Sequence, residues 1–552
     1  MSDTNRVYSD APVLIVGAGL VGLSSSLFLA WHGIPSLLVE RHAGFSLQPR
    51  ARDINALTME AYHKVGLEEA IYQTSPPDRP SGSITRMKSL VDLQGRVLVQ
   101  DMSTPKGELS SMRTSFIGQS GLEPLLLRQA QALGQTLGSA WCYSSELVSW
   151  EQDAHEVRAV IRDLLDGKCH VVHTQYLIAA DGNTSEIREQ TGIAKRGPGL
   201  LSREINLLFR SEALKQVLQN RTFFRCYIDN PHVTGTMSFT VDYETQVVNG
   251  GVLTLSLPLD SSEREDNFMG ERGLALIRAA IGVPDLPIEL IDVSSWDAAA
   301  FVAERFQQER LFLVGDAAHV IPPTGGFGAN TGIADAYNLA WKLAFVLHEQ
   351  AGPALLNTYN AERQPIAQLT VDQAYALYRE RLAPRAPRIK SESQVSAFPT
   401  LDHDTIIFGT RIHSTAIVPS HWNENNYEDP HHPSGQPGTR APYVPLIDTQ
   451  RQHLSTLDLF GQQFVLLTSD CGDTWKEIVS AVMQHLKVHI QVYSIGARGD
   501  FVVDEKRWSD TYHLCEHEAV LVRPDGIIAW RSGEAQTVDE LEQALVHILA
   551  RS

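Results

Sequence analysis

The sequence predicts an α/β protein in which an antiparallel sheet interrupts a nucleotide-binding domain and a further α/β domain follows. Three observations predict this fold class. An apolar strand, a glycine-rich turn and a helix open the chain at residues 13–31. Alternating apolar segments fill residues 192–296, and strands alternate with helices again after residue 463. The 552 residues are enough for about three domains of ordinary size.

The composition excludes several classes of protein. Lys and Arg number 46 against 65 Asp and Glu, and the net charge of −19 disfavours nucleic acid as a partner. Five widely spaced cysteines form no CxxC and no Cys/His ligand spacing, so we expect neither disulfides nor a metal site. Residues 1–10 lack the pattern of a secretory signal, so we expect a cytoplasmic protein.

One apolar segment, residues 13–31, carries no charge and is close to the length of a membrane-spanning helix. Its first four residues are rich in β-branched side chains, and three glycines follow them before a more helical stretch. A strand, a tight turn and a buried helix explain this order better, so we expect no membrane span.

The glycine-rich turn reads Gly17-Ala18-Gly19-Leu20-Val21-Gly22 and is followed by a second apolar strand at 36–39 that ends at Glu40. In this βαβ unit the glycines allow a tight turn, a close approach to a pyrophosphate, and close packing of the helix. The helix N-terminus favours phosphate, and the Glu40 carboxylate can accept hydrogen bonds from both ribose hydroxyls. The unit predicts a site for the adenosine of FAD or NAD. Its predicted cofactor-binding residues are Gly17, Gly19, Leu20, Val21, Gly22, Glu40 and Arg41.

Two further motifs read as strand, acidic turn and helix. One runs from residue 176 through Asp181-Gly182 to Arg188; the other runs from residue 311 through Gly315-Asp316 and continues as PPTGGFGANTG at 322–332. With the first motif, in this order, they resemble the group A flavoprotein monooxygenases, the single-component FAD-dependent aromatic hydroxylases. A YxxERxP run at 359–365 extends the resemblance over about the first 380 residues. No second GxGxxG occurs, which excludes disulfide reductases and enzymes with two nucleotide domains.

The resemblance implies one bound FAD and assigns residues to it. Asp316 binds the ribityl chain, Asp181 lies on the pyrophosphate side, and Gln119 of a QxxLE pattern contacts the flavin chain. The alternative for these three is an ordinary capping role at a helix end. A helix that begins near Gly328 is implied to point at the flavin pyrimidine ring, where its N–H groups stabilise negative charge. The cofactor-binding residues implied in this part are Gln119, Asp181, Gly315, Asp316, Gly328, Asn330 and Thr331.

Residues 49–60 resemble the PRARGxxxRTME stretch of the family, with two departures. Asp53 replaces a glycine and Leu57 replaces an arginine, so the turn and one ion pair near the flavin must be built differently. Arg50 and Arg52 are candidates for the FAD phosphates and for the flavin edge with its substrate, unless both are exposed loop arginines. The predicted catalytic residues are Arg52, Pro323 and Gly326.

The alternating segments at 221–228, 234–241 and 250–257 read as an antiparallel sheet, which is the substrate domain in the family. Arg225 and Tyr227 alternate along one strand and point either into the substrate pocket or to solvent. We expect a FAD-binding domain at 1–190 that resumes at 297–400 after this substrate domain at 191–296.

The tail, residues 401–552, begins with a linker and resembles the thioredoxin-like C-terminal domain of phenol and polyketide hydroxylases. Cys471-Gly472-Asp473-Thr474 stands where a redox thioredoxin has CxxC, and one sulfur cannot form the internal disulfide. The tail is therefore expected to serve in packing or in forming a homodimer.

The resemblance implies that NADPH or NADH reduces FAD and that O2 adds at flavin C4a. The terminal oxygen of this hydroperoxide is then transferred to a small-molecule aromatic substrate, for which a phenolic, polycyclic polyketide is favoured. Two alternatives stay open: Baeyer–Villiger or decarboxylative oxygenation of a related polyketide, and a flavin-binding protein without redox activity. Ring activation needs a base within hydrogen-bond reach, and the sequence does not identify one.

Overall fold

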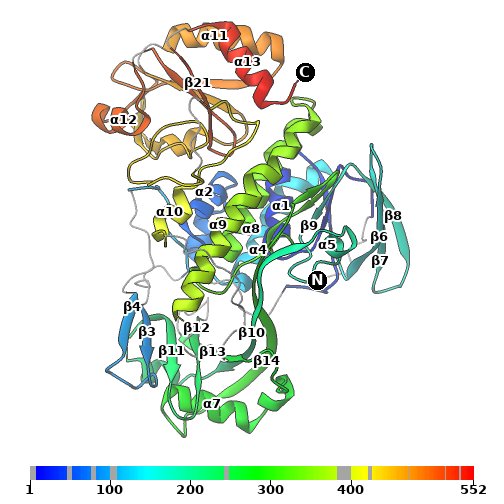
Figure 1. Ribbon diagram of the computed structural model, residues 1–552, viewed down its shortest axis with the longest axis vertical. Coiled ribbons are helices and arrows are strands. Elements are labelled where there is room, and N and C mark those ends of the chain that lie inside the picture. The colour runs from blue at the N-terminus through cyan, green and yellow to red at the C-terminus, as the bar shows by residue number, and fades with distance from the viewer. Residues whose placement is uncertain are drawn as a thin grey trace.

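A computed structural model of the chain describes residues 8–45, 53–75, 83–99, 108–219, 221–241, 248–381, 400–419, 425–469, 472–515, 517–533 and 536–551. A central α/β body carries a large sheet at one end and a smaller α/β domain at the other (Figure 1). The long helices α8 (Gly328–Leu347) and α9 (Asn357–Arg381) run through the middle.

The central body is built on a six-stranded sheet in the order β15-β16-β9-β1-β2-β5. Strands β1 (Val13–Val16), β2 (Ser36–Glu40), β9 (Tyr176–Ala179) and β16 (Leu311–Leu313) are apolar, buried and parallel to one another. The edges are β5 (Ala140–Tyr143) and β15 (Gln307–Gln308). Parallel strands end at the same edge, so the acidic residues that follow β2, β9 and β16 gather there.

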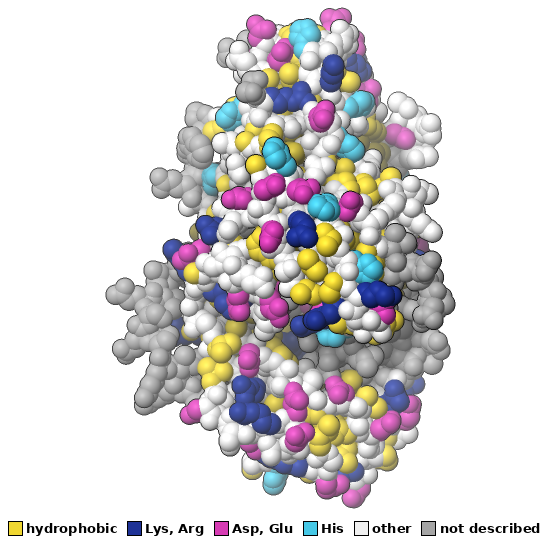
Figure 2. Space-filling view, turned by 90° about the vertical axis from the view of Figure 1, so that its right-hand side faces the viewer, with side chains coloured by type: hydrophobic (Ala, Val, Ile, Leu, Met, Phe, Trp, Pro, Cys, Tyr) yellow, Lys and Arg dark blue, Asp and Glu magenta, His cyan; other side chains and the backbone are white. Residues whose placement is uncertain are grey.

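Helix α1 (Leu20–Trp31) follows β1 directly and is buried almost throughout, so the predicted strand, turn and helix at 13–31 are confirmed. Within the part of the chain that the structure describes, no helix combines the length and the hydropathy that crossing a bilayer requires. On the face drawn in Figure 2, acidic and basic side chains are interspersed rather than gathered by sign.

The predicted antiparallel sheet is confirmed, and it is larger than predicted. Its order is β17-β14-β10-β13-β12-β11-β3-β4. The last two strands at one end, β3 (Ser83–Met87) and the edge strand β4 (Arg96–Val99), come from far upstream, and β3 pairs with β11 in parallel. The other strands are β10 (Lys195–Arg210), β11 (Phe223–Asp229), β12 (Thr234–Val241), β13 (Val248–Leu257), β14 (Glu289–Ala303) and β17 (His319–Val320).

Helix α7 (Glu271–Ile281) covers one face of this sheet. Its Ile277 packs in a buried cluster with Cys226 and Ile228 of β11. Because side chains alternate along a strand, Arg225 and Tyr227 lie on the opposite face, toward the central body. Helix α6 (Leu214–Leu218) packs in the same cluster. The remaining elements around the central body are α2 (Ala56–Lys64), α3 (Glu68–Thr74), α4 (Gln119–Gly134), β6 (Ser145–Gln152), β7 (Val157–Asp163), β8 (Cys169–Thr174), α5 (Glu186–Gln190) and α10 (His403–Phe408).

The C-terminal domain contains a four-stranded sheet in the order β21-β20-β23-β24, with β20 parallel to β21 and antiparallel to β23. Helices α11 and α13 share one buried cluster with this sheet, and α12 shares another with its other face. The elements are β18 (Pro445–Asp448), β19 (His453–Ser455), β20 (Phe464–Thr468), α11 (Gly472–Leu486), β21 (Ile490–Ser494), β22 (Phe501–Val502), α12 (Glu505–Tyr512), β23 (Ala519–Val522), β24 (Ile528–Arg531) and α13 (Val538–Ile548).

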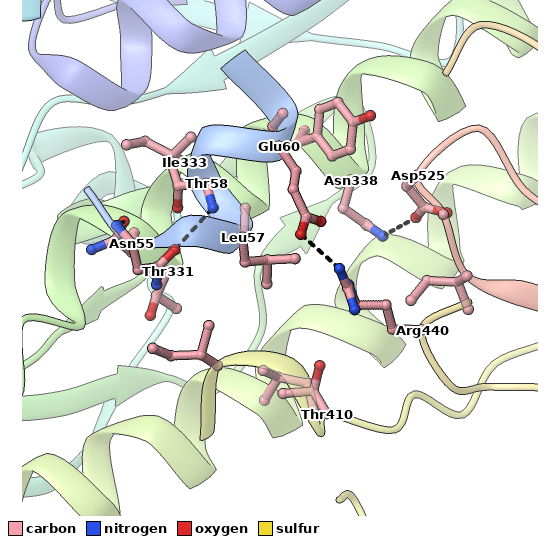
Figure 3. Close-up of a pocket in the computed structure, with 18 of the residues that line it drawn as sticks. Asn55, Leu57, Thr58, Glu60, Thr331, Ile333, Asn338, Thr410, Arg440 and Asp525 are labelled. Carbon is pink, nitrogen blue, oxygen red and sulfur yellow. Dashed lines mark hydrogen bonds and ion pairs between the residues drawn. The ribbon is translucent and has the colours of Figure 1, made fainter. Parts of the chain in front are cut away.

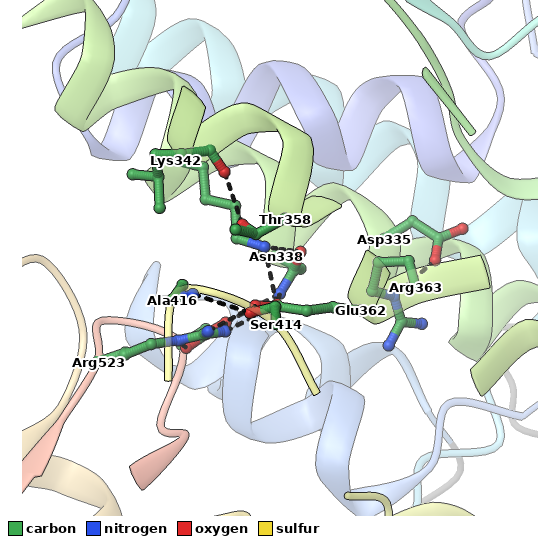
Figure 4. A network of polar contacts seen from close by, with 11 residues as sticks. Asp335, Asn338, Lys342, Thr358, Glu362, Arg363, Ser414, Ala416 and Arg523 are labelled. Carbon is green, nitrogen blue, oxygen red and sulfur yellow. Dashed lines mark hydrogen bonds and ion pairs between the residues drawn. The ribbon is translucent and has the colours of Figure 1, made fainter. Parts of the chain in front are cut away.

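A buried charge network joins this domain to the central body (Figure 4). The Glu362 carboxylate on α9 accepts two hydrogen bonds from Arg523, at 2.7 and 2.9 Å, and one from Lys342 at 2.8 Å. Ser414 and Asn338 donate to it as well. Burial by itself would raise the pKa of Glu362, but Arg523 and Lys342 outweigh burial and hold this pKa well below its usual range. Both partners of the salt bridge are thus charged and fully hydrogen-bonded.

We predict that Glu362→Ala destabilises the protein by about 3–5 kcal/mol, because it leaves the buried Lys342 without its ion-pair partner and leaves Arg523 with Asp525 alone. The matched control is Glu380→Ala, an exposed position on the same helix, where a change within about 0.5 kcal/mol is expected. Urea unfolding followed by tryptophan fluorescence measures both. Equal urea midpoints for the two variants would show that the Glu362 network contributes no more to the stability than an exposed glutamate does.

Candidate active site

The glycine-rich turn after β1 is shaped by the chain's own packing at two of its three glycines. Gly17 has φ +106°, and a Cβ there would lie 2.3 Å from the Ala180 carbonyl oxygen. A Cβ at Gly22 would lie 1.9 Å from the Gly17 carbonyl oxygen. At Gly19, by contrast, an added Cβ meets no atom within 4 Å. The turn therefore leaves open space at Gly19, where the fingerprint expects the pyrophosphate.

Glu40 is held beside this turn. Its Oε2 accepts a hydrogen bond from the Ala18 backbone N–H at 2.8 Å, and its Oε1 accepts one from the His42 N–H at 2.8 Å. The carboxylate is thereby fixed at the end of β2, next to the N-terminus of α1, as ribose binding requires. Of the neighbouring predicted residues, Leu20 is buried, Val21 is half-buried and Arg41 is exposed.

The two aspartates predicted to contact FAD follow β9 and β16 at the same sheet edge. The Oδ1 of Asp181 is buried and has no hydrogen-bond partner among the described residues, and burial raises the pKa of this carboxyl. Asp316 is exposed within an otherwise buried run. Neither is the N-cap residue of a helix, since Ser185 caps α5 and the residue before the turn at 315–317 is Val314. The Oδ2 of Asp181 does accept from the Ile187 N–H in the first turn of α5, at 3.3 Å. A buried, unsatisfied carboxylate oxygen and an exposed carboxylate on one edge suit a polar ligand such as FAD.

Gln119 stands at the start of α4 and is half-buried. Its side-chain amide donates to Oε1 of Glu123 at 2.6 Å, and the N-cap position of the helix is Gly118, without a side-chain cap. The capping alternative for Gln119 is therefore wrong. A role of Gln119 toward the flavin chain stays a prediction.

The turn that carries Asp316 is fixed from behind by Asp335 of α8. One oxygen of this carboxylate accepts from the Gly315 N–H at 3.1 Å and contacts His319 Nε2 at 2.7 Å; the other accepts from Arg363 Nε at 2.8 Å. Burial would raise the pKa of Asp335, but His319 and Arg363 hold it below its usual value. His319 is fully buried and thus has a structural role here.

The glycine-rich loop before α8 is tied to the segment that precedes α2. The Asn330 side chain accepts from the Asn55 N–H at 3.0 Å and donates to the carbonyl oxygens of Gly326, at 2.8 Å, and Asp53, at 3.2 Å. The Thr331 hydroxyl donates to the Phe327 carbonyl oxygen. Both side chains are occupied within the protein, and the Thr331 N–H binds the Phe327 carbonyl oxygen. The backbone that can face a cofactor is therefore that of the first residues of α8, before Thr331.

On the substrate side, Arg225 of β11 reaches this loop. Its Nη1 donates to the Pro323 carbonyl oxygen at 2.8 Å, so the strand face that carries Arg225 points inward rather than to solvent. Tyr227, on the same face, is 2% exposed. Arg50 and Arg52 lie outside the described residues, and their predicted roles stay predictions.

A cavity of about 170 Å³ lies between α2, α8, α9, α10 and the C-terminal domain (Figure 3). Its walls are mainly apolar, with two polar pairs: Glu60 with Arg440 at 2.6 Å, and Asn338 with Asp525 at 3.0 Å. Residues 17–22, Asp181 and Asp316 do not line it, but Asn330 and Thr331 do. The cavity therefore adjoins the predicted cofactor site at the start of α8 and does not include the glycine-rich turn or the two aspartates.

Comparison with known proteins agrees with this geometry. Residues 10–374 match the family profile of the FAD binding domain, and residues 434–552 match the C-terminal domain of aromatic-ring hydroxylases. The chain belongs to the FAD-dependent aromatic-ring hydroxylases, the group A flavin monooxygenases. It is similar over its whole length to members with named substrates.

One relative is a 4-methyl-5-nitrocatechol 5-monooxygenase of Burkholderia, 39% identical over 98% of each chain. Another is an aklavinone 12-hydroxylase of Streptomyces purpurascens, 34% identical over 98% of this chain and 99% of the relative. The crystal structure of an aklavinone-11 hydroxylase with FAD and aklavinone superposes with a TM-score of 0.86, at 32% identity and with all of both chains covered. The chain is an FAD-dependent monooxygenase related to polyketide and aromatic hydroxylases, and FAD is its cofactor.

Sequence reasoning missed residues that hold the turns of this hydroxylase site in place and do not themselves belong to a motif. Asp335 lies in a run of small helical residues and carries no motif, although Arg363 of the YxxERxP run pointed to its neighbourhood. Asn55, which caps α2 and binds Asn330, was read as part of a loop pattern only. A buried acid inside an apolar helix was the one usable signal for Asp335.

We predict that Gly19→Ala and Gly22→Ala fail in different ways. Gly22→Ala forces a Cβ onto the Gly17 carbonyl and should lower the melting temperature of the apoprotein. Gly19→Ala meets no protein atom, so the apoprotein should melt as the wild type does while FAD affinity falls. Thermal melts of apoprotein and FAD titration test the pair. Unchanged FAD binding in Gly19→Ala would show that the backbone there does not approach the cofactor.

We expect Asp316→Ala to yield largely colourless protein, because the ribityl chain loses its carboxylate partner. Asp510→Ala, an exposed aspartate on α12, is the control and should purify yellow. The ratio of flavin to protein absorbance measures both. Full FAD content in Asp316→Ala would overturn the assignment of Asp316.

Proposed function

We propose that this enzyme hydroxylates a phenolic aromatic substrate, one atom of O2 entering the ring and NADPH or NADH supplying the electrons. A polycyclic polyketide is the favoured substrate. The full-length similarity to enzymes named for aklavinone, one of them with aklavinone bound, carries this proposal. The inward-facing strand β11 beside the loop at 322–328 supports it, because a ring bound there would lie between the substrate sheet and the flavin.

FAD, when bound, takes a hydride from the nicotinamide and makes O2 reactive toward the ring. The chain supplies binding, orientation and protection from water. We assign Glu40 to the ribose, Asp181 and Gly19 to the pyrophosphate side, and Asp316 to the ribityl chain. The backbone N–H groups at the start of α8 face the flavin ring, where fixed donors stabilise negative charge better than water does.

We further propose the domain division 1–190 with 297–400, 191–296 and 401–552, and a thioredoxin-like tail. The order β21-β20-β23-β24, one parallel and two antiparallel pairings, and helices on both sheet faces support this likeness. Cys471 lies outside the described residues. The buried Glu362–Arg523 contact supports a packing role for the tail rather than electron transfer.

A single-ring catechol is the second candidate substrate class. It is supported by the 39% identity to a monooxygenase named for 4-methyl-5-nitrocatechol, which is higher than the identity to the aklavinone enzyme. Both classes carry a phenolic hydroxyl, so the chemistry required of the site is the same.

We predict that aklavinone or another polycyclic phenol stimulates NADPH or NADH oxidation more strongly than 4-methyl-5-nitrocatechol does. Initial rates of NADPH or NADH oxidation, followed by the absorbance of the reduced nicotinamide at about 340 nm, test this prediction together with the mass of the product. A gain of one oxygen with the ring count intact supports hydroxylation; ring expansion or loss of CO2 supports the Baeyer–Villiger or decarboxylative alternative. No stimulation by either class would favour a redox-silent flavoprotein.

A further inference from the structure

Asp53, which replaces a glycine of the resembled pattern, lies against the loop that faces the flavin. A Cβ added at Gly326 would lie 2.4 and 2.9 Å from the two oxygens of the Asp53 carboxylate. The carboxylate therefore occupies the space beside Gly326 that a side chain would otherwise fill. Asp53 and Gly326 are matched to each other, although they come from different ends of the FAD-binding domain.

The backbone on the C-terminal side of Asp53 is fixed by hydrogen bonds. The Asp53 carbonyl oxygen accepts from the Asn330 side chain, and Ile54 exchanges two backbone hydrogen bonds of 2.8 Å with Ser115. Asp53 caps no helix, because Asn55 is the N-cap of α2. A structural duty thus does not explain an acid at this position.

The Asp53 carboxylate accepts no hydrogen bond and forms no ion pair with any residue the structure describes, and part of its surface stays accessible. Arg225 reaches the same loop through its Nη1 bond to Pro323, while its Nε–H is buried with no hydrogen-bond partner in the described chain. The Asp53 carboxylate is therefore an unused hydrogen-bond acceptor and the Arg225 Nε–H an unused donor beside the same loop. A phenolic hydroxyl needs that pair: it can donate to the carboxylate and accept from the Nε–H.

The electrostatic surroundings let this acid change charge near neutral pH. Burial raises the pKa of Asp53 to about 7, against the opposing effect of Arg225. Two further titratable groups among the described residues lie near Arg225 and this loop. Glu204 of β10 interacts with Arg225, and His403 of α10 contacts the Gly325 carbonyl oxygen. A base acts best when its pKa lies near the working pH.

We propose that Asp53 is the catalytic base that takes the proton from a phenolic hydroxyl of the substrate, with Arg225 as the donor to the resulting oxyanion. The phenol O–H bond breaks and its electron pair stays on the phenolic oxygen. The proton forms an O–H bond on the Asp53 carboxylate, so the total charge is unchanged. The phenolate then pushes electron density into the ring, which makes its ortho and para carbons better acceptors of the oxygen atom. This inference rests on the proposed function.

The first test uses the holoenzyme with oxidised FAD and 2-naphthol, a phenol whose own pKa is close to the tyrosine value of about 10. Difference spectra report whether the bound probe is phenol or phenolate. We expect wild-type protein to bind 2-naphthol and to ionise it well below its free pKa. Asp53→Asn and Asp53→Gly should bind it as the neutral phenol, and Asp53→Glu should restore ionisation.

The second test is the pH dependence of kcat/KM for hydroxylation of the fastest polycyclic phenol. In the wild type kcat/KM should rise with increasing pH, with an apparent pKa near that of Asp53. In Asp53→Asn this rise should vanish and kcat should fall by about 100- to 10,000-fold, while the protein stays yellow and oxidises NADPH to yield H2O2. Arg225→Met should move the rise to higher pH, because the Arg225 charge lowers the pKa of Asp53.

The outcomes separate the two proposals. A wild-type enzyme that oxygenates no phenol overturns the proposed function, and the 2-naphthol spectra then still decide the role of Asp53 because they need no turnover. The role of Asp53 is overturned if wild-type protein does not bind or does not ionise 2-naphthol. It is equally overturned if yellow Asp53→Asn keeps both the wild-type kcat and the wild-type pH profile.

Discussion

The close approach of α8 to the turn at Gly315 is the constraint on which the rest of the site depends. A Cβ at Gly332 would lie 2.7 Å from a Val21 methyl and 2.9 Å from the Gly315 Cα, so helix α8 and the turn after β16 meet backbone to backbone, with Val21 of α1 packed against both. Asp335 completes the contact by binding the Gly315 N–H. This packing aims the start of α8 and its free N–H groups at the sheet edge where the three acidic residues gather.

The buried acids of the protein fall into two groups with different consequences. Asp335 and Glu362 are surrounded by donors and cations, stay ionised, and hold elements together. Asp181 has one carboxylate oxygen without a hydrogen-bond partner among the described residues, the Asp53 carboxylate accepts none from them, and burial raises the pKa of both. Saturated acids stabilise a fold, whereas acids with unsatisfied oxygens are costly unless a ligand or a reaction uses them. The second group lies on the side where cofactor and substrate are expected.

The parts that were predictable from sequence are those in which a short segment contains all the residues that fix its conformation. The strand, turn and helix at 13–31 and the tail strands follow from local apolar patterns and glycines, and the structure has them within a few residues. The direction of Arg225 was not predictable, because a strand pattern does not say which face is covered. The parallel pairing of β3 with β11 was missed because it joins segments more than a hundred residues apart.

The sequence by itself determined the nucleotide-binding unit, the family and the acids at the ends of β2, β9 and β16, since each depends on neighbours along the chain. Only the tertiary structure decided what surrounds those residues. Asn55 and Asn330 are 275 positions apart, yet their hydrogen bond brings Asp53 to Gly326. Arg225 reaches Pro323 from a different domain. Contacts of this kind depend on how whole sheets and helices pack, and no local pattern of residues encodes them.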